Sequence, residues 1–163
     1  RDLVRSRGLG DVYKRQLMEC GHYEVAKAYI LYREKRAALR RVRADLAREV
    51  GDDALEDLLR QIQKDFEEEV YPLSALQLKF ESFCKPAMTT DAKMEALTKA
   101  AVELTTVEAP KWEFIAARLL NHTFSKRNAS RWTECGVKGL YEKLRYLTDK
   151  GLYGDYILAR YSR

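Results

Sequence analysis

The sequence contains few residues that interrupt helices and few that could cross-link a fold. Among its 163 residues there are only 8 Gly, 3 Pro and 3 Cys. Cys20, Cys84 and Cys135 are odd in number, lie far apart and show no Cys-x-x-Cys spacing, so we expect neither a disulfide framework nor a zinc site. This use of cysteine indicates a reducing, cytoplasmic location.

Long apolar runs are missing as well. A bilayer-spanning helix needs about 18 or more consecutive apolar residues, and a secretion signal needs an apolar stretch between basic residues and a small-residue cleavage site. The sequence shows neither pattern, so no membrane partner is expected. The net charge of +5, from 30 Lys and Arg against 25 Asp and Glu, is modest for a dedicated nucleic-acid binder. We therefore expect no nucleic-acid partner.

What the sequence does contain is typical of a globular helical protein. Hydrophobic residues make up 46% and charged residues 34% of the chain, a balance that excludes the disordered and fibrous classes. The predicted fold class is all-α, a helical bundle of about six to seven helices with a long N-terminal helix. Residues 1–15 lack an initiator Met and a helical apolar period, and they resemble a foreign or disordered leader.

Helix limits follow from apolar periodicity and capping residues. Gly51 suits the end of a long helix and Asp52 the start of the next, because Gly accepts a left-handed cap and Asp accepts hydrogen bonds from free backbone N–H groups. Pro110 fits a first helical turn. One long helix, or two joined by a bend, is predicted over 22–49. Further helices are predicted over 53–65, 72–84, 90–105 and from 110 onward, with a polar loop at 125–136 and two short helices within 139–150 and 152–162.

Apolar spacing also predicts which side chains form the core. Met94, Leu97, Ala101 and Leu104 recur at helical steps in one predicted helix. In the next, one face carries Trp112, Ile115, Ala116, Leu119 and Thr123. The segments 21–36 and 110–127 echo each other, with Tyr23 matching Trp112 and Glu24 matching Glu113, which suggests a repeated unit.

No catalytic or metal-binding constellation can be assembled from the sequence. His22 and His122 have no set of His, Cys, Asp or Glu at the spacing of metal ligands. No serine lies in a Gly-x-Ser-x-Gly context. The three cysteines are expected to be buried or unreactive. The arginine-rich segment 33–48 is compatible with a phosphate-binding stripe, but its interleaved acidic residues favour a solvated helix face.

Three stretches, taken in order, resemble the ribonucleotide reductase large subunit. The stretch "GHYEVAKAYILYREKR" (21–36) resembles the last helix of an ATP-cone, the regulatory nucleotide-binding module of that family. Residues 83–127, "FCKPAMTTDAKMEALTKAAVELTTVEAPKWEFIAARLLNHTFSKR", resemble the stretch leading into the reductase body, and "LYEKLRYLTDKGLYGDYILARYS" (140–162) resembles the segment that follows. The resemblance covers about 17–163.

The resemblance implies a division of the chain into four parts. Residues 1–15 are the leader, 16–49 the C-terminal helix of a truncated ATP-cone, 50–130 a second cone-like helical domain without its lid, and 131–163 the start of the reductase N-terminal helical domain. In the family, the parent enzyme reduces ribonucleoside diphosphates by radical chemistry, with a radical-generating small subunit as its partner. The resemblance also implies a homo-oligomeric parent whose catalytic cysteines lie outside this chain, which should be inactive alone.

The same resemblance suggests candidate effector contacts. ATP or dATP is the allosteric effector in the family, and Thr90 and Lys126 fall where it has an effector-contacting threonine and lysine. A hydroxyl at a helix start and a nearby ammonium are suitable phosphate contacts. However, Met94 and Thr123 replace two expected histidines and the glycine-rich lid is missing. We therefore expect a degenerate cone kept for packing, with no effector firmly expected. The alternative is a freestanding helical adaptor or weak nucleic-acid-binding protein that uses the arginine-rich segment.

Overall fold

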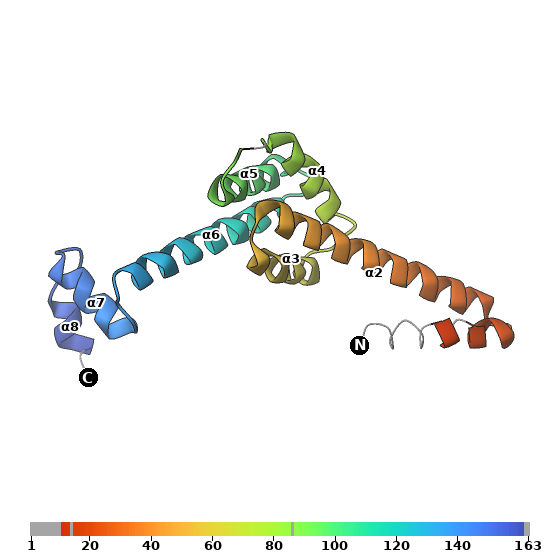
Figure 1. Ribbon diagram of the computed structural model, residues 1–163, viewed down its shortest axis with the longest axis horizontal. Coiled ribbons are helices and arrows are strands. Elements are labelled where there is room, and N and C mark those ends of the chain that lie inside the picture. Colours follow the sequence, from red (N-terminus) through yellow and green to blue (C-terminus); the bar gives the residue numbers. More distant parts are fainter. Residues whose placement is uncertain (1–10, 14, 86, 162–163) are drawn as a thin grey trace. The chain divides into compact units, whose positions relative to one another are not determined.

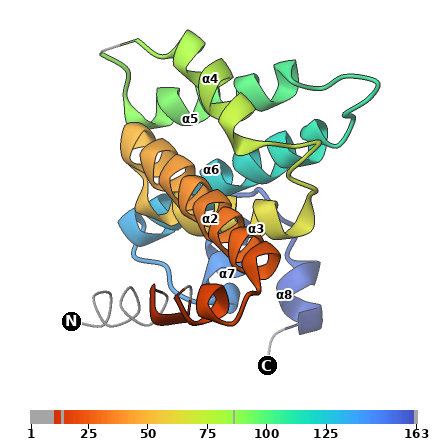
Figure 2. The ribbon, with the colours of Figure 1, turned by 90° about the vertical axis from the view of Figure 1, so that its right-hand side faces the viewer.

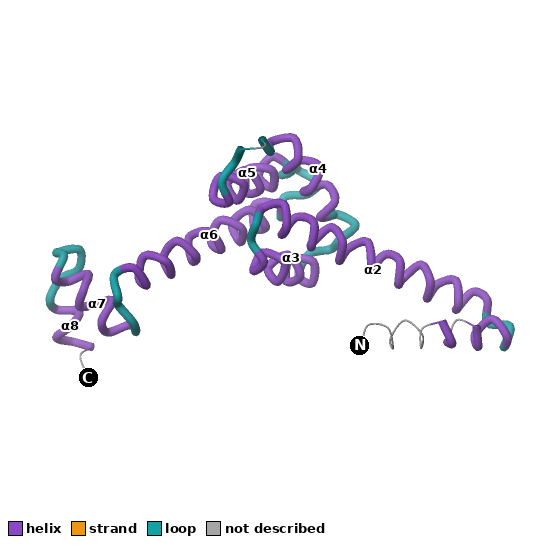
Figure 3. Tube along the Cα trace, in the orientation of Figure 1, coloured by secondary structure: helices purple, strands orange, loops and turns teal. Residues whose placement is uncertain are grey.

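In the computed structural model every regular element of the described part of the chain is a helix, which confirms the all-α class. The structure describes residues 11–13, 15–85 and 87–161. Figure 3 shows helices joined by short loops. The predicted leader lies largely outside the described residues, but residues 11–13 and 15 are helical. The helices are α2 (Tyr23–Val50), α3 (Asp53–Asp65), α4 (Leu73–Phe83), α5 (Thr90–Glu103), α6 (Trp112–Glu134), α7 (Leu140–Asp149) and α8 (Tyr156–Tyr161).

The chain divides into two compact units, residues 1–82 and 83–163. This division rests on internal contacts, whereas the four-part division predicted from the sequence rests on resemblance. The four-part division therefore stays a prediction.

In the first unit, α3 lies against the C-terminal half of α2 (Figure 1 and Figure 2). The turn between them has the predicted caps. Gly51 adopts the left-handed conformation with φ 81° and donates its N–H to the Ala47 carbonyl at 2.9 Å. The buried Asp52 carboxylate accepts the Ala54 N–H at 3.1 Å. The core side chains of these two helices are Leu46, Ala47, Val50, Leu55, Leu59 and Ile62.

In the second unit, α5 and α6 make the main contact. The start of α5 is ion-paired to Arg127 far along α6, so the two helices run antiparallel. The predicted core face of α6 is confirmed, since Trp112, Ile115, Ala116, Leu119 and Thr123 are all buried. Met94, Leu97 and Ala101 of α5 are buried as well, while Leu104 is only half-buried.

The predicted polar loop at 125–136 is wrong, because α6 continues to Glu134. Polar composition suggested a loop, but no Gly or Pro interrupts the segment before Gly136, where φ becomes 67°. Side-chain bonds one turn apart add support: the Thr133 hydroxyl donates to the Ala129 carbonyl at 2.9 Å. The segment is thus a solvated helix.

Candidate functional site

Thr90 and Lys126, the predicted effector contacts, lie at the same end of the α5–α6 pair. Thr90 is the first residue of α5 and Lys126 lies late in α6, and both side chains are exposed. Their sequence neighbours Asp91 and Arg127 are ion-paired at 3.3 Å, which brings the two chain segments together. The structure therefore places the predicted residues on adjacent segments.

The charge at this end of the pair is already balanced. Arg127 also contacts Glu95 at 2.9 Å. The hydrogen bond to Glu95 and the charge of Asp91 raise the pKa of Arg127, so its cation is stabilised by carboxylates of the same unit. A polyphosphate bound here would have to displace these carboxylates from Arg127 or would be repelled by their negative charges.

The N-terminus of α5 is likewise occupied by its own residues. The Thr89 hydroxyl, one residue before the predicted contact, accepts the Ala92 N–H at 3.3 Å. Asp91 adds a negative charge in the first turn, where it complements the positive end of the helix dipole. The features that would attract a phosphate are satisfied within the protein.

The two positions where histidines were expected belong to the core. Met94 is 3% exposed and Thr123 is 5% exposed. The Thr123 hydroxyl donates to the Leu119 carbonyl at 3.1 Å, one turn earlier in α6. Neither side chain offers a group to a ligand outside the helix pair.

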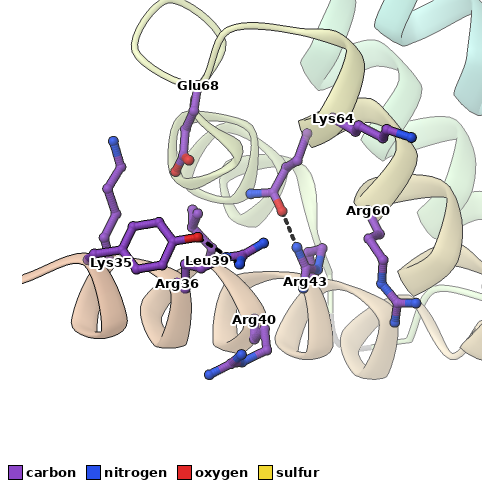
Figure 4. Close-up of a pocket in the computed structure, with 10 residues that line it drawn as sticks. Lys35, Arg36, Leu39, Arg40, Arg43, Arg60, Lys64 and Glu68 are labelled. Atoms are coloured by element: carbon purple, nitrogen blue, oxygen red, sulfur yellow. Dashed lines mark hydrogen bonds between the residues drawn. The ribbon is translucent and has the colours of Figure 1, made fainter. Parts of the chain in front are cut away.

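A second candidate site lies in the first unit, where residues of α2, of α3 and of the turn after α3 line an open pocket of about 770 Å³ (Figure 4). We call it the basic pocket. Its cations are Lys35, Arg36, Arg40, Arg43, Arg60 and Lys64. Its other lining residues are Tyr32, Leu39, Gln63 and Glu68, so six cations face one carboxylate.

The cations of the basic pocket have few charged partners. Arg60 pairs with Asp57 at 3.2 Å and with Glu56 at 3.7 Å on its own helix. For the other five cations, the described part of the chain provides no ion pair. Arg36 donates to the Tyr32 hydroxyl at 2.8 Å and lies over its ring.

Arg43 and Gln63, which both line the pocket, have side-chain hydrogen-bond donors that are not all satisfied. The Arg43 guanidinium donates a hydrogen bond to the Gln63 side-chain oxygen. Arg43 Nε and Gln63 Nε2 are buried, and among the described residues neither has an acceptor. Burial, followed by the charge of Arg60, lowers the pKa of Arg43. The pocket therefore holds a surplus of hydrogen-bond donors and of positive charge.

The sequence carries a signal for this pocket, although the acidic residues interleaved in 33–48 favour a solvated helix face. Arg36, Arg40 and Arg43 recur at steps of four and three, which places them on one helix face. Arg60 and Lys64 repeat the step of four on the next helix. Periodicity within each helix does not predict how α3 packs on α2, and it is this packing that brings the two basic faces to one pocket.

The remaining candidate groups form no reactive cluster. Cys20 and Cys135 are exposed and Cys84 is half-buried. Within residues 11–13, 15–85 and 87–161, no group of three His, Cys, Asp or Glu side chains could hold a metal ion. Across the same residues, no helix combines the length and apolarity needed to cross a bilayer.

Comparison with known proteins gives one similar chain. The sequence is 40% identical over 160 residues to a ribonucleoside-diphosphate reductase subunit alpha of Treponema pallidum (strain Nichols). The match covers 98% of this chain, more than the expected 17–163, and so extends into the first 15 residues. It covers 19% of the relative.

Two other comparisons add nothing to this match. No protein-family model matches the sequence, and no solved structure matches it. The resemblance stated from the sequence is confirmed by the curated relative: this chain corresponds to a segment of a ribonucleotide reductase large subunit, about a fifth of that subunit in length.

Proposed function

We propose that the chain is the N-terminal regulatory and structural part of a ribonucleoside-diphosphate reductase large subunit. The parent enzyme reduces ribonucleotides to deoxyribonucleotides by radical chemistry, with a radical-generating small subunit as its partner. The observation that carries the proposal is the 40% identity over nearly the whole chain to an alpha subunit. This segment contributes helical packing and interface surface, and it does not turn over substrate alone.

The distribution of apolar surface supports a role within a larger subunit. None of the described side chains of α7 is buried. Leu140 is 75% exposed, and Leu152 and Tyr156 beyond it are 68% and 72% exposed. Several large apolar side chains exposed within one short segment are typical of a surface that another part of a protein covers. In the proposed parent, the reductase body covers this segment.

The proposal assigns the α5–α6 end to packing and not to effector binding. The Arg127 ion pairs and the Thr89 cap satisfy the groups that a triphosphate would use. We expect Thr90→Val and Lys126→Gln to leave any affinity of the chain for ATP unchanged. A tenfold loss in either variant, measured by calorimetry, would assign the effector to these residues.

The functional test is a chimera. The matched segment of the Treponema alpha subunit is replaced by this chain, and reduction of a ribonucleoside diphosphate is measured with the small subunit present. We expect the chimera to assemble and retain activity, while this chain alone gives none. A chimera that folds and binds substrate but cannot associate with its small subunit or with itself would contradict the proposed role.

Sequencing the locus on both sides of these residues tests the same proposal without protein. We expect an open reading frame that continues into a catalytic α/β barrel with cysteines. A stop codon directly after Arg163 would favour the freestanding adaptor instead.

A further inference from the structure

Six positively charged side chains from two helices meet in the lining of the basic pocket. The whole sequence has 30 Lys and Arg and 25 Asp and Glu, and the lining of the basic pocket accounts for six of the former and one of the latter. Arg60 is ion-paired to Glu56 and Asp57 of its own helix, so the surplus of positive charge at the pocket belongs to the other five cations, which have no ion pair among the described residues.

Such a surplus raises the free energy of the isolated pocket, because like charges that share a cavity repel one another. Burial, followed by the charge of Arg60, lowers the pKa of Arg43; Arg40 and Arg36 act in the same direction and Glu56 opposes them. The repulsion is relieved when an anion enters. The buried donors Arg43 Nε and Gln63 Nε2 also lack acceptors among the described residues, and an anion oxygen can supply them.

We propose that the basic pocket between α2 and α3 binds the polyphosphate group of a small molecule. Guanidinium groups from two helices provide forked donors that match phosphate oxygens, and the two lysines of the lining add point charges. A volume of about 770 Å³ lies within the ordinary range of small-ligand cavities. This site is separate in sequence from Thr90 and Lys126, and it does not depend on the proposed function.

The grouping of the cations around one pocket favours a compact anion over a nucleic acid strand. A nucleic-acid-binding surface follows an extended backbone with a long basic track and several stacking aromatics. Here Tyr32 is the one aromatic in the lining, with its hydroxyl already bound to Arg36. Glu68, on the turn after α3, adds a negative charge at one side of the pocket (Figure 4).

A pair of matched double variants tests the proposal on the full 163-residue chain. Lys35→Gln with Arg36→Gln removes two exposed cations of the pocket. Lys27→Gln with Arg41→Gln removes one lysine and one arginine from the same helix, where both are exposed and neither lines the pocket. Both variants change the net charge by the same amount, so a nonspecific charge effect would weaken binding equally.

The ligands are inorganic tripolyphosphate, ATP, orthophosphate and a single-stranded DNA oligomer, titrated by calorimetry at low salt. We expect tripolyphosphate to bind more tightly than orthophosphate, and the pocket variant to lose at least about tenfold in affinity while the control loses less than about threefold. If ATP and tripolyphosphate bind with equal affinity, the pocket recognises the phosphate chain alone. If ATP binds more tightly and the pocket variant loses that extra affinity, the pocket also contacts the nucleoside of ATP.

Amide chemical shifts in NMR spectra locate the site directly. We expect tripolyphosphate to shift residues 32–43 and 60–68 and to leave residues 89–95 and 123–127 unchanged. The proposal is overturned by an absence of tripolyphosphate binding, by equal losses in both double variants, by shifts confined to the α5–α6 end, or by DNA binding more than tenfold tighter than tripolyphosphate.

Discussion

Two neighbouring leucines of α6 allow a sharp test of the α5–α6 core. Leu119 is 0% exposed and Leu120 is 42% exposed. Replacing Leu119 with Ala removes a fully buried side chain and leaves a cavity, which costs about 2–5 kcal/mol of unfolding free energy. Leu120 hides little more than half of its surface, and truncation there opens no enclosed cavity, so Leu120→Ala should cost about 1 kcal/mol or less.

The two variants share one helix and one chemical change, so helix propensity cancels in the comparison. The assay is urea unfolding followed by the fluorescence of Trp112, which is 3% exposed in the same core. A Trp132→Phe background removes the second tryptophan, which packs edge-on against Tyr146 at 5.9 Å. We expect the transition midpoint to fall much further for Leu119→Ala at an unchanged slope. Equal midpoints would refute the packing of α6 described above.

Three further predictions concern caps and a tyrosine. Asp52→Ala should lower stability by about 1–2 kcal/mol because the Ala54 N–H loses its acceptor, while Asp52→Asn should cost far less; urea unfolding checks both. Gly51→Ala should cost about 1 kcal/mol in the same assay, since φ is 81° there. The hydrogen bond to Cys135, followed by its charge, raises the pKa of Tyr146. In Cys135→Ala this tyrosine should therefore titrate at lower pH, nearer its ordinary value, in NMR of its ring carbons, and an unchanged titration would contradict this cause.

The helices whose ends carry local signals could be predicted closely from the sequence. The predicted range 53–65 is that of α3, and 22–49 differs from α2 by one residue at each end. Both results depend on Gly51 and Asp52, whose conformational preferences act within a few residues and need no tertiary contact. The end of α6 was missed because its solvated segment lacks an apolar stripe, and periodicity carries no signal for such a helix.

The sites could not be predicted in the same way, because their chemistry depends on which helices meet. Lys126 is a suitable phosphate contact by residue type. Its neighbour Arg127, however, forms hydrogen bonds to Asp91 and Glu95, which lie 36 and 32 positions earlier in the chain. Conversely, the sequence alone favours a solvated face for the arginines of α2. In the structure, Arg60 of α3 lines the same pocket as Arg36, Arg40 and Arg43. The sequence gives the number of charged residues, but only the packing of the helices decides which of them lie close together at a site.

The echoed segments 21–36 and 110–127 show how one pattern can have two outcomes. Trp112 is 3% exposed, while Tyr23 at the matching position is 66% exposed. In the first segment Ala26 is the one buried side chain among the described residues, whereas the second buries five. The first half of α2 thus has the apolar spacing of a buried helix without the packing that its echo receives from α5. In the proposed parent subunit, a counterpart of α5 would have to cover Tyr23 and Val25, and the first half of α2 alone should exchange its amide hydrogens faster than α6.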